Sequence, residues 1–349
     1  MTTTRVAVVF GGKSGEHEVS VTSARNVLAA LDREIWEPVP IGVTTDGNWL
    51  GCNATQALLD SGARRLEGGE PFFTATSALA SLASCGMAFP LIHGTNGEDG
   101  TIQGLFEVAG MPYAGCGVAA SAIGMDKALM KALFREAGVA VARYLVARSW
   151  EMRENSETLR RLIEKDLGYP CFVKPANGGS SVGVTKVRSR EDLGAAFSAA
   201  FAYDDKVLVE EEIQGQEVEC SVLGNERPEV SQTGEIVPDR EFYDYESKYD
   251  TASTSALHIP ARVSAEVEEE VRALALRMYQ VMDCEGYARV DFFVRNGTEV
   301  FANEINTIPG FTNISMYPKL WAAEGLEYSA LLTRILDLGL QRSERRARL

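Results

Sequence analysis

Histidine and paired cysteines are scarce in this sequence. Only three histidines occur among 349 residues, which excludes a histidine-rich metal centre. The six cysteines include no C-x-x-C pair and lie at Cys52, Cys85, Cys116, Cys171, Cys220 and Cys284. Scattered cysteines without a metal-binding spacing are typical of cytoplasmic proteins with reduced thiols. We therefore expect buried free thiols and a cytoplasmic location, with neither disulfides nor zinc.

Long apolar runs and an excess of positive charge are also missing. No stretch approaches the ~20 apolar residues that a membrane-spanning helix needs, so we expect no membrane partner. Lysine and arginine number 34 against 49 aspartate and glutamate residues, which gives a net charge of −15. This balance argues against nucleic-acid partners, because phosphate backbones are bound by basic surfaces. An anionic ligand must instead meet a few locally placed lysines and arginines.

The chain opens with a pattern that is typical of α/β proteins. The apolar run at residues 5–10 predicts a buried strand rather than a signal peptide, and a glycine-rich turn and a helix follow it. The glycine spacing is G-G-x-x-G, so it does not match the dinucleotide-binding motif G-x-G-x-x-G. Glu16 lies just beyond the carboxyl end of the strand, where α/β sheets bind ligands. A structural alternative is that Glu16 favours the positive end of the helix.

A second junction between strand and loop repeats this pattern. Residues 87–92 form an apolar strand that ends in the polar, glycine-rich loop 93–100, which begins with His93. The two loops place Glu16 and His93 at one rim of a parallel sheet, although His93 alone is more simply an ordinary loop residue. A chain of this length exceeds one core, so we expect two or three domains and assign the first to residues 1–125.

The central region combines lysines with a loop of small residues. Asp126 is a predicted N-cap for a helix over 127–137, and Lys127 in its first turn opposes the helix dipole unless it has an anionic partner. Lys174 ends a predicted strand. The loop that follows, N-G-G-S-S-V-G, is suited to phosphates through its backbone N–H groups and hydroxyls, and it contains Ser180 and Ser181. A surface hairpin without a ligand is the alternative.

The next segment is acidic and then irregular. A strand at 207–213 ends in carboxylates, which are usually solvated, but its edge could hold an adenosine with Glu217 on the ribose hydroxyls. Residues 239–258 show no periodicity, and so long a loop is often functional, for example as a lid. Amphipathic helices are predicted at 264–282 and 328–340, and the basic end from Arg342 onward is expected to fray.

Asn296-Gly297 separates two apolar runs and predicts a β-hairpin. If these two residues form the whole loop, Arg289 lies opposite Glu304 and Asp291 lies opposite Ala302. Because side chains alternate along a strand, one face then carries Arg289, Asp291, Glu304 and Asn306. The other face, which we expect to be buried, carries Val290, Phe292, Val294, Phe301 and Ile305.

The polar face of this hairpin is the strongest candidate site. Carboxylates are rarely buried unless they are paired or bind a metal, and oxygen-only ligands suit Mg²⁺. A solvated outer face with a cross-strand Arg–Glu pair is the alternative at this point.

Taken together, the motifs carry a family resemblance. FGGKSGEHEVS, HGTNGEDGTIQG, MDK, FVKPANGGSSVGV, FYDYESKY, ARVDFF and NEINTIPGFTNISM occur in this order. The sequence resembles the D-alanine–D-alanine ligases of the ATP-grasp superfamily over nearly its whole length. The resemblance implies an α/β (α+β ATP-grasp) fold with three domains: an N-terminal parallel α/β domain at 1–125 that binds substrate, and two domains at 126–215 and 216–349 that clamp ATP.

The resemblance also implies roles for individual residues. The expected ATP contacts are Lys127, Lys174, Ser180, Ser181, Glu210 and Glu217. The expected metal ligands are Asp291, Glu304 and Asn306, holding two Mg²⁺ ions for which Mn²⁺ could substitute. The expected catalytic residues are Glu16, Ser180, Tyr249, Arg289 and Gly310. The expected substrate contacts are Glu16, His93, Lys248, Ser315 and Met316.

The implied reaction joins two D-alanines through an acyl phosphate at the expense of ATP, for peptidoglycan precursor synthesis. Alternatives are ligation of D-alanine to D-lactate or D-serine, and an ATP-binding regulatory protein without catalysis. Lys248 and Tyr249 favour the dipeptide, because depsipeptide-forming relatives tend to depart from this motif. The resemblance further suggests a homodimer and leaves open the use of a monovalent cation.

Overall fold

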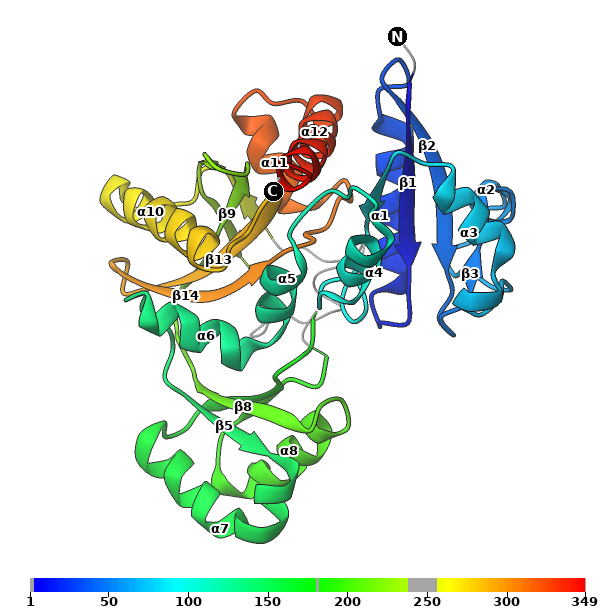
Figure 1. Cartoon of the computed structure of the whole chain (residues 1–349). Helices are drawn as coiled ribbons and strands as arrows, with labels where there is room; N and C mark the ends of the chain where they lie inside the picture. The colour runs from blue at the N-terminus through cyan, green and yellow to red at the C-terminus, as the bar shows by residue number, and fades with distance from the viewer. Residues whose placement is uncertain (1–2, 180–181, 238–255, 349) are drawn as a thin grey trace.

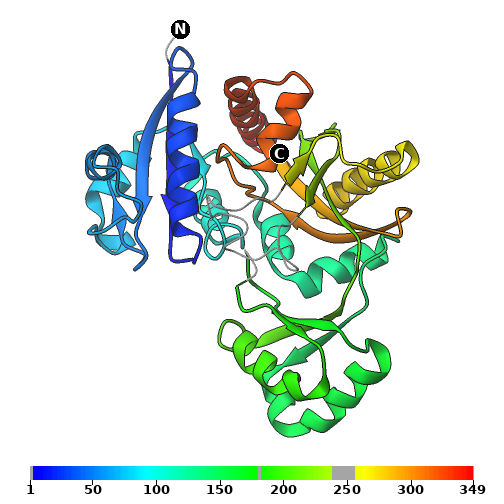
Figure 2. The same cartoon turned by 180° about the vertical axis from the view of Figure 1, so that it is seen from behind.

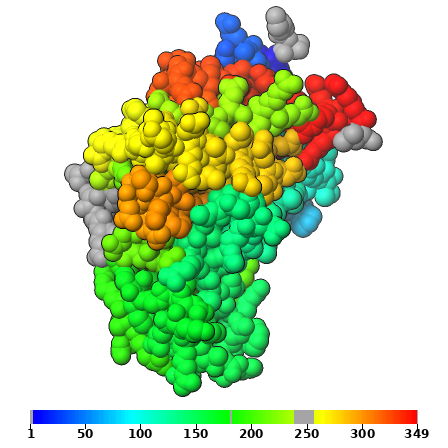
Figure 3. All heavy atoms as spheres, turned by 90° about the vertical axis from the view of Figure 1, so that its left-hand side faces the viewer, coloured from blue at the N-terminus to red at the C-terminus, as the bar shows by residue number. Residues whose placement is uncertain are grey.

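The computed structural model describes residues 3–179, 182–237 and 256–348. Its strands form three sheets, and each sheet is the centre of one lobe (Figure 1). The same lobes are seen from behind in Figure 2. In the side view of Figure 3, the lobe that ends the chain lies directly on the green central lobe.

The first lobe is built on a sheet with the strand order β3-β2-β1-β4. Val6 to Phe10 are fully buried, as expected for a strand of a parallel sheet that is covered on both faces. β1 pairs in parallel with β2 and β4, which confirms the predicted parallel α/β unit. The strands are β1 (Thr4–Gly11), β2 (Trp36–Val43), β3 (Trp49–Leu50) and β4 (Met87–Pro90); the helices are α1 (His17–Ala30), α2 (Cys52–Asp60), α3 (Thr76–Ala83) and α4 (Thr101–Ala109).

The second lobe contains an antiparallel sheet with the order β5-β8-β6-β7. Two helices cover the face that points away from the rest of the molecule (Figure 1), and their apolar residues close a separate core. The elements are β5 (Tyr144–Arg148), α7 (Ser149–Asp166), β6 (Cys171–Pro175), β7 (Thr185–Val187), α8 (Leu193–Phe201) and β8 (Lys206–Glu211).

The third lobe holds the largest sheet, with the order β12-β11-β9-β13-β14 and β10 beside β9. Residues 256–258 were expected in the long loop, but they form a strand that pairs with β11. The strands are β9 (Gln216–Leu223), β10 (Glu229–Val230), β11 (Gly234–Val237), β12 (Ala256–His258), β13 (Tyr287–Arg295) and β14 (Glu299–Asn306). The helices after β12 are α10 (Ala265–Val281), α11 (Met316–Ala323) and α12 (Tyr328–Arg346).

Two helices connect the first and second lobes and pack on the third sheet, α5 (Val118–Met125) and α6 (Lys127–Glu136). Asp126 accepts hydrogen bonds from the backbone N–H groups of Ala128 and Leu129, which confirms the predicted N-cap. The apolar side of α6 joins the core of the third lobe through Met130 and Phe134. Lys127 therefore stands at the junction of the second and third lobes. The proposed boundaries at 125 and 215 stay a prediction.

The register of the central hairpin differs from the prediction. Asn296 and Gly297 have positive φ, as expected, but Thr298 joins the loop and Arg295 pairs with Glu299. A bulge next to Asp291 then shifts the register once more. As a result Arg289 lies opposite Asn306, and Asp291 lies opposite Glu304. The predicted pairs Arg289–Glu304 and Asp291–Ala302 are wrong.

The two shifts compensate for each other at the far end of the hairpin. Arg289, Asp291, Glu304 and Asn306 still share one face, because each lies directly opposite another member of the set. Between the shifts, Phe301 pairs with Phe293 instead of turning into the core, and it is only half-buried. Its place in the core is taken by Val300 and Ala302. The prediction of a buried Phe301 is therefore wrong.

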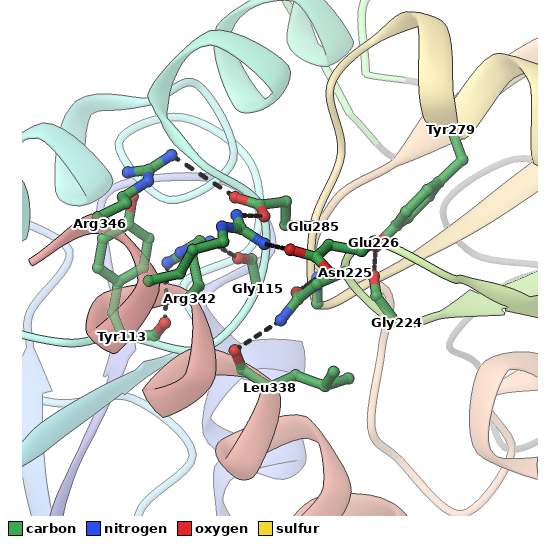
Figure 4. A network of polar contacts seen from close by, with 12 residues as sticks. Tyr113, Gly115, Gly224, Asn225, Glu226, Tyr279, Glu285, Leu338, Arg342 and Arg346 are labelled. Carbon is green, nitrogen blue, oxygen red and sulfur yellow. Dashed lines mark hydrogen bonds and ion pairs between the residues drawn. The ribbon is translucent and has the colours of Figure 1, made fainter. Parts of the chain in front are cut away.

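The carboxyl-terminal end is helical rather than frayed up to Arg346. Arg342 is 3% exposed and donates hydrogen bonds to the carbonyl oxygens of Tyr113 and Gly115. Arg346 lies beside Glu285 (Figure 4). These contacts join α12 to the segment that leaves the first lobe, which explains why a basic, polar sequence is ordered here.

All six cysteine thiols are free; four are buried and two are half-buried. In the part of the chain that the structure describes, no helix is both long and apolar enough to cross a membrane.

Candidate active site

A cavity of about 670 Å³ lies between the second and third lobes, a size that is common for small-molecule sites. β6 and β8 contribute to one wall, and β9, β11, β13 and β14 contribute to the other. Five residues that the sequence predicts for ATP or metal line this one space: Lys127, Lys174, Glu210, Glu217 and Glu304.

Lys127 connects the two walls of the cavity. Its Nζ donates to the carbonyl oxygen of Gly178 at 2.8 Å and lies 3.2 Å from Oε2 of Glu304. Burial alone would lower the pKa of Lys127, but the charge of Glu304 outweighs it, and the pKa is raised. The anionic partner that Lys127 needs at a helix N-terminus is therefore Glu304 of the hairpin.

Glu210 is shared between two lysines at the back of the cavity. Lys174 forms an ion pair with one carboxylate oxygen, and Lys131 of α6 lies 2.5 Å from the other. Burial alone would raise the pKa of Glu210, but the two lysines outweigh it and lower that pKa to about 2. Sequence analysis missed Lys131. Its signal was the spacing of four residues from Lys127, which places both lysines on one side of a helix.

Arg289 is held by carboxylates on two adjacent strands. Its guanidinium donates to both oxygens of Asp291, at 2.7 and 2.6 Å, and lies 3.1 Å from Oε2 of Glu219. Burial opposes the charge on Arg289, but Asp291 and Glu219 outweigh it, so its pKa is raised well above the ordinary value. Glu219, which sequence analysis also missed, pairs with Asp291 across β9 and β13. Three carboxylates, Glu219, Asp291 and Glu304, thus lie abreast on three neighbouring strands.

The oxygen atoms of this face fit a hard divalent cation. Asp291 and Glu304 are direct neighbours, and Asn306 follows two residues later on the same face, with its Oδ1 accepting a hydrogen bond from the N–H of Ile308. Among the described residues, no three His, Cys, Asp or Glu side chains form a group that could hold a metal. Two carboxylates, the amide of Asn306 and oxygen atoms of a substrate would be a usual composition for a Mg²⁺ site on this face.

Glu16 of the first lobe reaches the glycine-rich segment that follows β6 in the second lobe. A Cβ atom added to Gly179 would lie 2.7 Å from Oε2 of Glu16, and one added to Gly94 would lie 3.0 Å from the same oxygen. A Cβ atom at Gly179 would displace the carboxylate of Glu16 from this place. Glu16 is the N-cap residue of α1, yet within the described chain its side chain accepts no capping hydrogen bond. The structure thus brings Glu16 to the loop after Lys174 and also leaves it at the N-terminus of α1, where the helix dipole favours its charge.

His93 is buried between the first and third lobes. One ring nitrogen, Nδ1, lies 3.0 Å from the carbonyl oxygen of Ile308, and Nε2 lies 3.1 Å from Oγ of Ser23. Burial lowers the pKa of His93, but Glu98 outweighs this effect and the pKa is raised. The ring therefore fastens the loop after β4 to the segment after β14.

The loop after β14 carries the remaining predicted residues. Oγ of Ser315 accepts a hydrogen bond from the N–H of Thr312 at 2.9 Å, and a Cβ atom on Gly310 would lie 2.7 Å from that same Oγ. Ser315 and Gly310 are thus adjacent. Met316 is 4% exposed, and its side chain packs with Ile236 in a small apolar cluster. Four predicted residues lie outside the described residues: Ser180, Ser181, Lys248 and Tyr249.

Comparisons with known proteins decide the family. A model described as "D-ala D-ala ligase N-terminus" matches residues 5–116, and one described as "D-ala D-ala ligase C-terminus" matches residues 133–337. The chain belongs to the D-alanine–D-alanine ligase family. This membership confirms the predicted family and the ATP-grasp fold class, and it confirms the ATP-dependent ligase class.

Individual members of this ligase family are similar to this chain over almost their full length. The D-alanine–D-alanine ligase of Caldicellulosiruptor bescii is 46% identical, with 99% of this chain and 98% of the relative covered. That of Geobacillus thermodenitrificans is 44% identical, with 98% and 96% covered.

Solved structures of this family are similar as well. The D-alanine–D-alanine ligase of Coxiella burnetii has a TM-score of 0.83 and 33% identity, covering 100% of this chain and 97% of the other. The VanG D-Ala:D-Ser ligase of Enterococcus faecalis has a TM-score of 0.81 and 34% identity, covering 97% and 100%.

Proposed function

We propose that this ligase joins two D-alanine molecules to D-alanyl-D-alanine, with ATP converted to ADP and phosphate. The observation that supports it best is the shared cavity, where Lys174 of the second lobe and Lys127 at the junction of the second and third lobes face Glu304 of the third. Cations for phosphates and oxygen ligands for Mg²⁺ are the groups that phosphoryl transfer needs.

The proposed chemistry has two steps. In the first, a carboxylate oxygen of one D-alanine attacks the γ-phosphorus of ATP, ADP leaves, and an acyl phosphate forms. In the second, the amine of another D-alanine attacks the acyl carbon, phosphate leaves, and the amine loses a proton. Positioning and charge neutralisation carry most of such a reaction, because the phosphoryl group itself needs little covalent help.

The nucleotide occupies the cavity in this proposal. Lys127 and Lys174 contact the phosphates, Glu217 at the start of β9 binds the ribose hydroxyls, and Glu210 holds Lys174 at the cavity until the nucleotide enters. Ser180 and Ser181 cover the phosphates. The half-buried ring of Phe293 and the chain around Ile213 line the cavity as well, which suits the apolar faces of a purine.

The metal site uses Asp291, Glu304 and Asn306, which would hold two Mg²⁺ ions, with Mn²⁺ as a substitute. Bound Mg²⁺ supplies positive charge to the phosphate oxygens. The residues must exchange partners for this, because Arg289 occupies both oxygens of Asp291 and Lys127 lies at Glu304. Glu219 then keeps Arg289 at the site, where it can stabilise the oxyanion of the second step together with the N–H of Gly310.

The amino acid subsites lie where the first lobe meets the third. Glu16 binds the ammonium group of the first D-alanine. His93 holds the neighbouring loop after β4 in place. Lys248 and Ser315 hold the carboxylate of the second, next to the backbone of Met316, and Tyr249 connects to Glu16 and Ser180. We further propose that the protein is a cytoplasmic homodimer. Whether a monovalent cation raises the rate can be measured in the activity assay described below.

One alternative function has a specific observation behind it: ligation of D-alanine to D-serine as the second substrate. One of the similar solved structures is a D-Ala:D-Ser ligase. The relatives that are 44–46% identical are named D-alanine–D-alanine ligases. D-alanine is therefore favoured as the second substrate. The test is to incubate the protein with ATP, Mg²⁺ and D-alanine, alone or with D-serine or D-lactate, and to quantify phosphate and products by mass spectrometry. L-alanine is the control. One D-alanyl-D-alanine per phosphate supports the proposal, whereas a mixed product in preference to the dipeptide, or phosphate release that needs no D-amino acid, contradicts it.

A further inference from the structure

Lys131 is a fully buried lysine for which the proposed reaction has no direct use. Its side chain is 0% exposed, on the side of α6 that faces β8, and it lies behind the cavity rather than among its lining residues. Burial is the largest influence on its pKa and lowers it, while Glu210 acts in the opposite direction. A buried lysine of this kind is costly unless it has a defined partner.

The partner of Lys131 is also the partner of a cavity lysine. Nζ of Lys131 lies 2.5 Å from Oε1 of Glu210, and Oε2 of Glu210 holds Lys174. Within the described residues, neither Nζ of Lys131 nor Oε1 of Glu210 makes a hydrogen bond of normal geometry. The two groups nevertheless form a close ion pair. One carboxylate thus lies between two ammonium groups, of which only Lys174 reaches the cavity.

This arrangement matters when a phosphate enters. A phosphate oxygen competes with Glu210 for the ammonium group of Lys174, so each contact that Lys174 makes with the phosphate weakens its ion pair with Glu210. Glu210 is 5% exposed, so without a second cation it would become an uncompensated buried carboxylate, which is strongly unfavourable. Lys131 stays beside Glu210 and removes that penalty.

We propose that Lys131 is a positioning residue for the nucleotide site, which neutralises Glu210 so that Lys174 can exchange this carboxylate for the phosphates of the nucleotide. The inference rests on the proposed ATP site between the second and third lobes. It adds a residue that touches no substrate and acts through Glu210 and Lys174.

The test compares nucleotides with and without phosphates in binding experiments. In the variant Lys131→Met, the affinity for ADP, measured by calorimetry, should fall at least tenfold, because Glu210 then retains Lys174. The affinity for adenosine should change less than twofold, because adenosine offers Lys174 no phosphate. Lys165→Met, at an exposed position of α7, is the matched control and should bind both ligands as the unchanged protein does.

A second variant separates positioning from folding. In Lys131→Met/Glu210→Gln the competing charge is gone, and a buried ion pair replaced by neutral groups of similar size is often tolerated. The double variant should recover most of the lost ADP affinity. Equal weakening of ADP and adenosine by Lys131→Met, or no recovery in the double variant, overturns the inference. If the unchanged protein binds neither ligand, the proposed ATP site itself is wrong and the inference is wrong with it.

Discussion

Asp291 of β13 lies directly opposite Glu304 of β14, so that two carboxylates share one face of a hairpin that borders the cavity. Like charges placed directly opposite each other destabilise a sheet. Here Arg289 and Lys127 balance them, and in the proposed mechanism a divalent ion takes over this role at the two carboxylates. The pair is therefore the part of the site that most specifically indicates metal-assisted phosphoryl transfer.

Replacing either carboxylate should remove most activity. Asp291→Asn and Glu304→Gln keep the shape of the side chain but lose the charge that Mg²⁺ needs, and we expect kcat to fall at least ~100-fold. Steady-state rates of dipeptide formation over a range of Mg²⁺ concentrations measure this. Glu299→Gln, on the exposed end of the same hairpin beside Arg295, is the control and should stay within about twofold. Near-normal rates in Asp291→Asn would remove the metal assignment.

Ser315 should matter for one substrate more than for the other. Its hydroxyl is fixed by Thr312 next to Gly310, and Ser315→Ala removes a group proposed to hold the carboxylate of the second D-alanine. We expect the KM for that D-alanine to rise by roughly tenfold with little change in the KM for ATP. Ser198→Ala, an exposed position of α8, should change neither. Equal changes in both KM values would place Ser315 elsewhere.

His93 should make stability depend on pH. Burial lowers its pKa, but the hydrogen bond and charge of Glu98 outweigh that effect, so the pKa is raised above 6.5 in the folded protein. The protonated form is thus favoured by folding. Its contribution to stability is complete below the unfolded pKa and is lost as pH rises through the folded value.

The corresponding experiment follows melting temperatures from about pH 6 to about pH 9, the window in which the raised pKa acts. The unchanged protein should lose stability across this range, and His93→Gln should lose less. His258→Gln, at a half-buried position of β12, should behave as the unchanged protein does. A His93→Gln variant with the same pH dependence would show that His93 is not protonated in the fold.

Arg342 should be essential to stability although it is far from the cavity. Its guanidinium satisfies the carbonyl oxygens of Tyr113 and Gly115 and lies 4.1 Å from the centre of the Tyr113 ring (Figure 4). Arg342→Met leaves these carbonyls without a donor and should cost about 2–4 kcal/mol of unfolding free energy in urea titrations. Arg348→Met, whose side chain is 79% exposed, should cost less than about 0.5 kcal/mol. Equal losses in both variants would contradict the role of Arg342.

The hairpin shows how far local sequence carries a prediction. Alternation along the strands correctly placed Arg289, Asp291, Glu304 and Asn306 on one face, because a period of two follows from backbone geometry alone. The pairs were wrong because Thr298 joins the loop and because a bulge lies next to Asp291. Beside that bulge, the N–H of Ala302 donates to the carbonyl oxygen of Ala140, in a distant segment, at 2.8 Å. No pattern within the hairpin indicates that contact.

The charged groups behind the site were beyond sequence analysis for the same reason. Lys131 stands in a predicted helix and Glu210 in a predicted strand, but only the packing of α6 against β8 joins them. Arg342 was assigned to a frayed end because its neighbours are basic and polar, and its acceptors at residues 113 and 115 lie in another lobe. The loops that carry Glu16 and His93 were correctly predicted to lie together, because the positions of loops at strand ends follow from the topology of α/β sheets.

The central claim is that the carboxylate of one D-alanine is activated by the γ-phosphoryl group of ATP. The most direct measurement uses D-alanine labelled with ¹⁸O in both carboxylate oxygens, with ATP and Mg²⁺, and determines the label in the released phosphate by mass spectrometry. An acyl phosphate predicts one ¹⁸O atom in each phosphate for every dipeptide formed. Dipeptide formation with unlabelled phosphate would contradict the account.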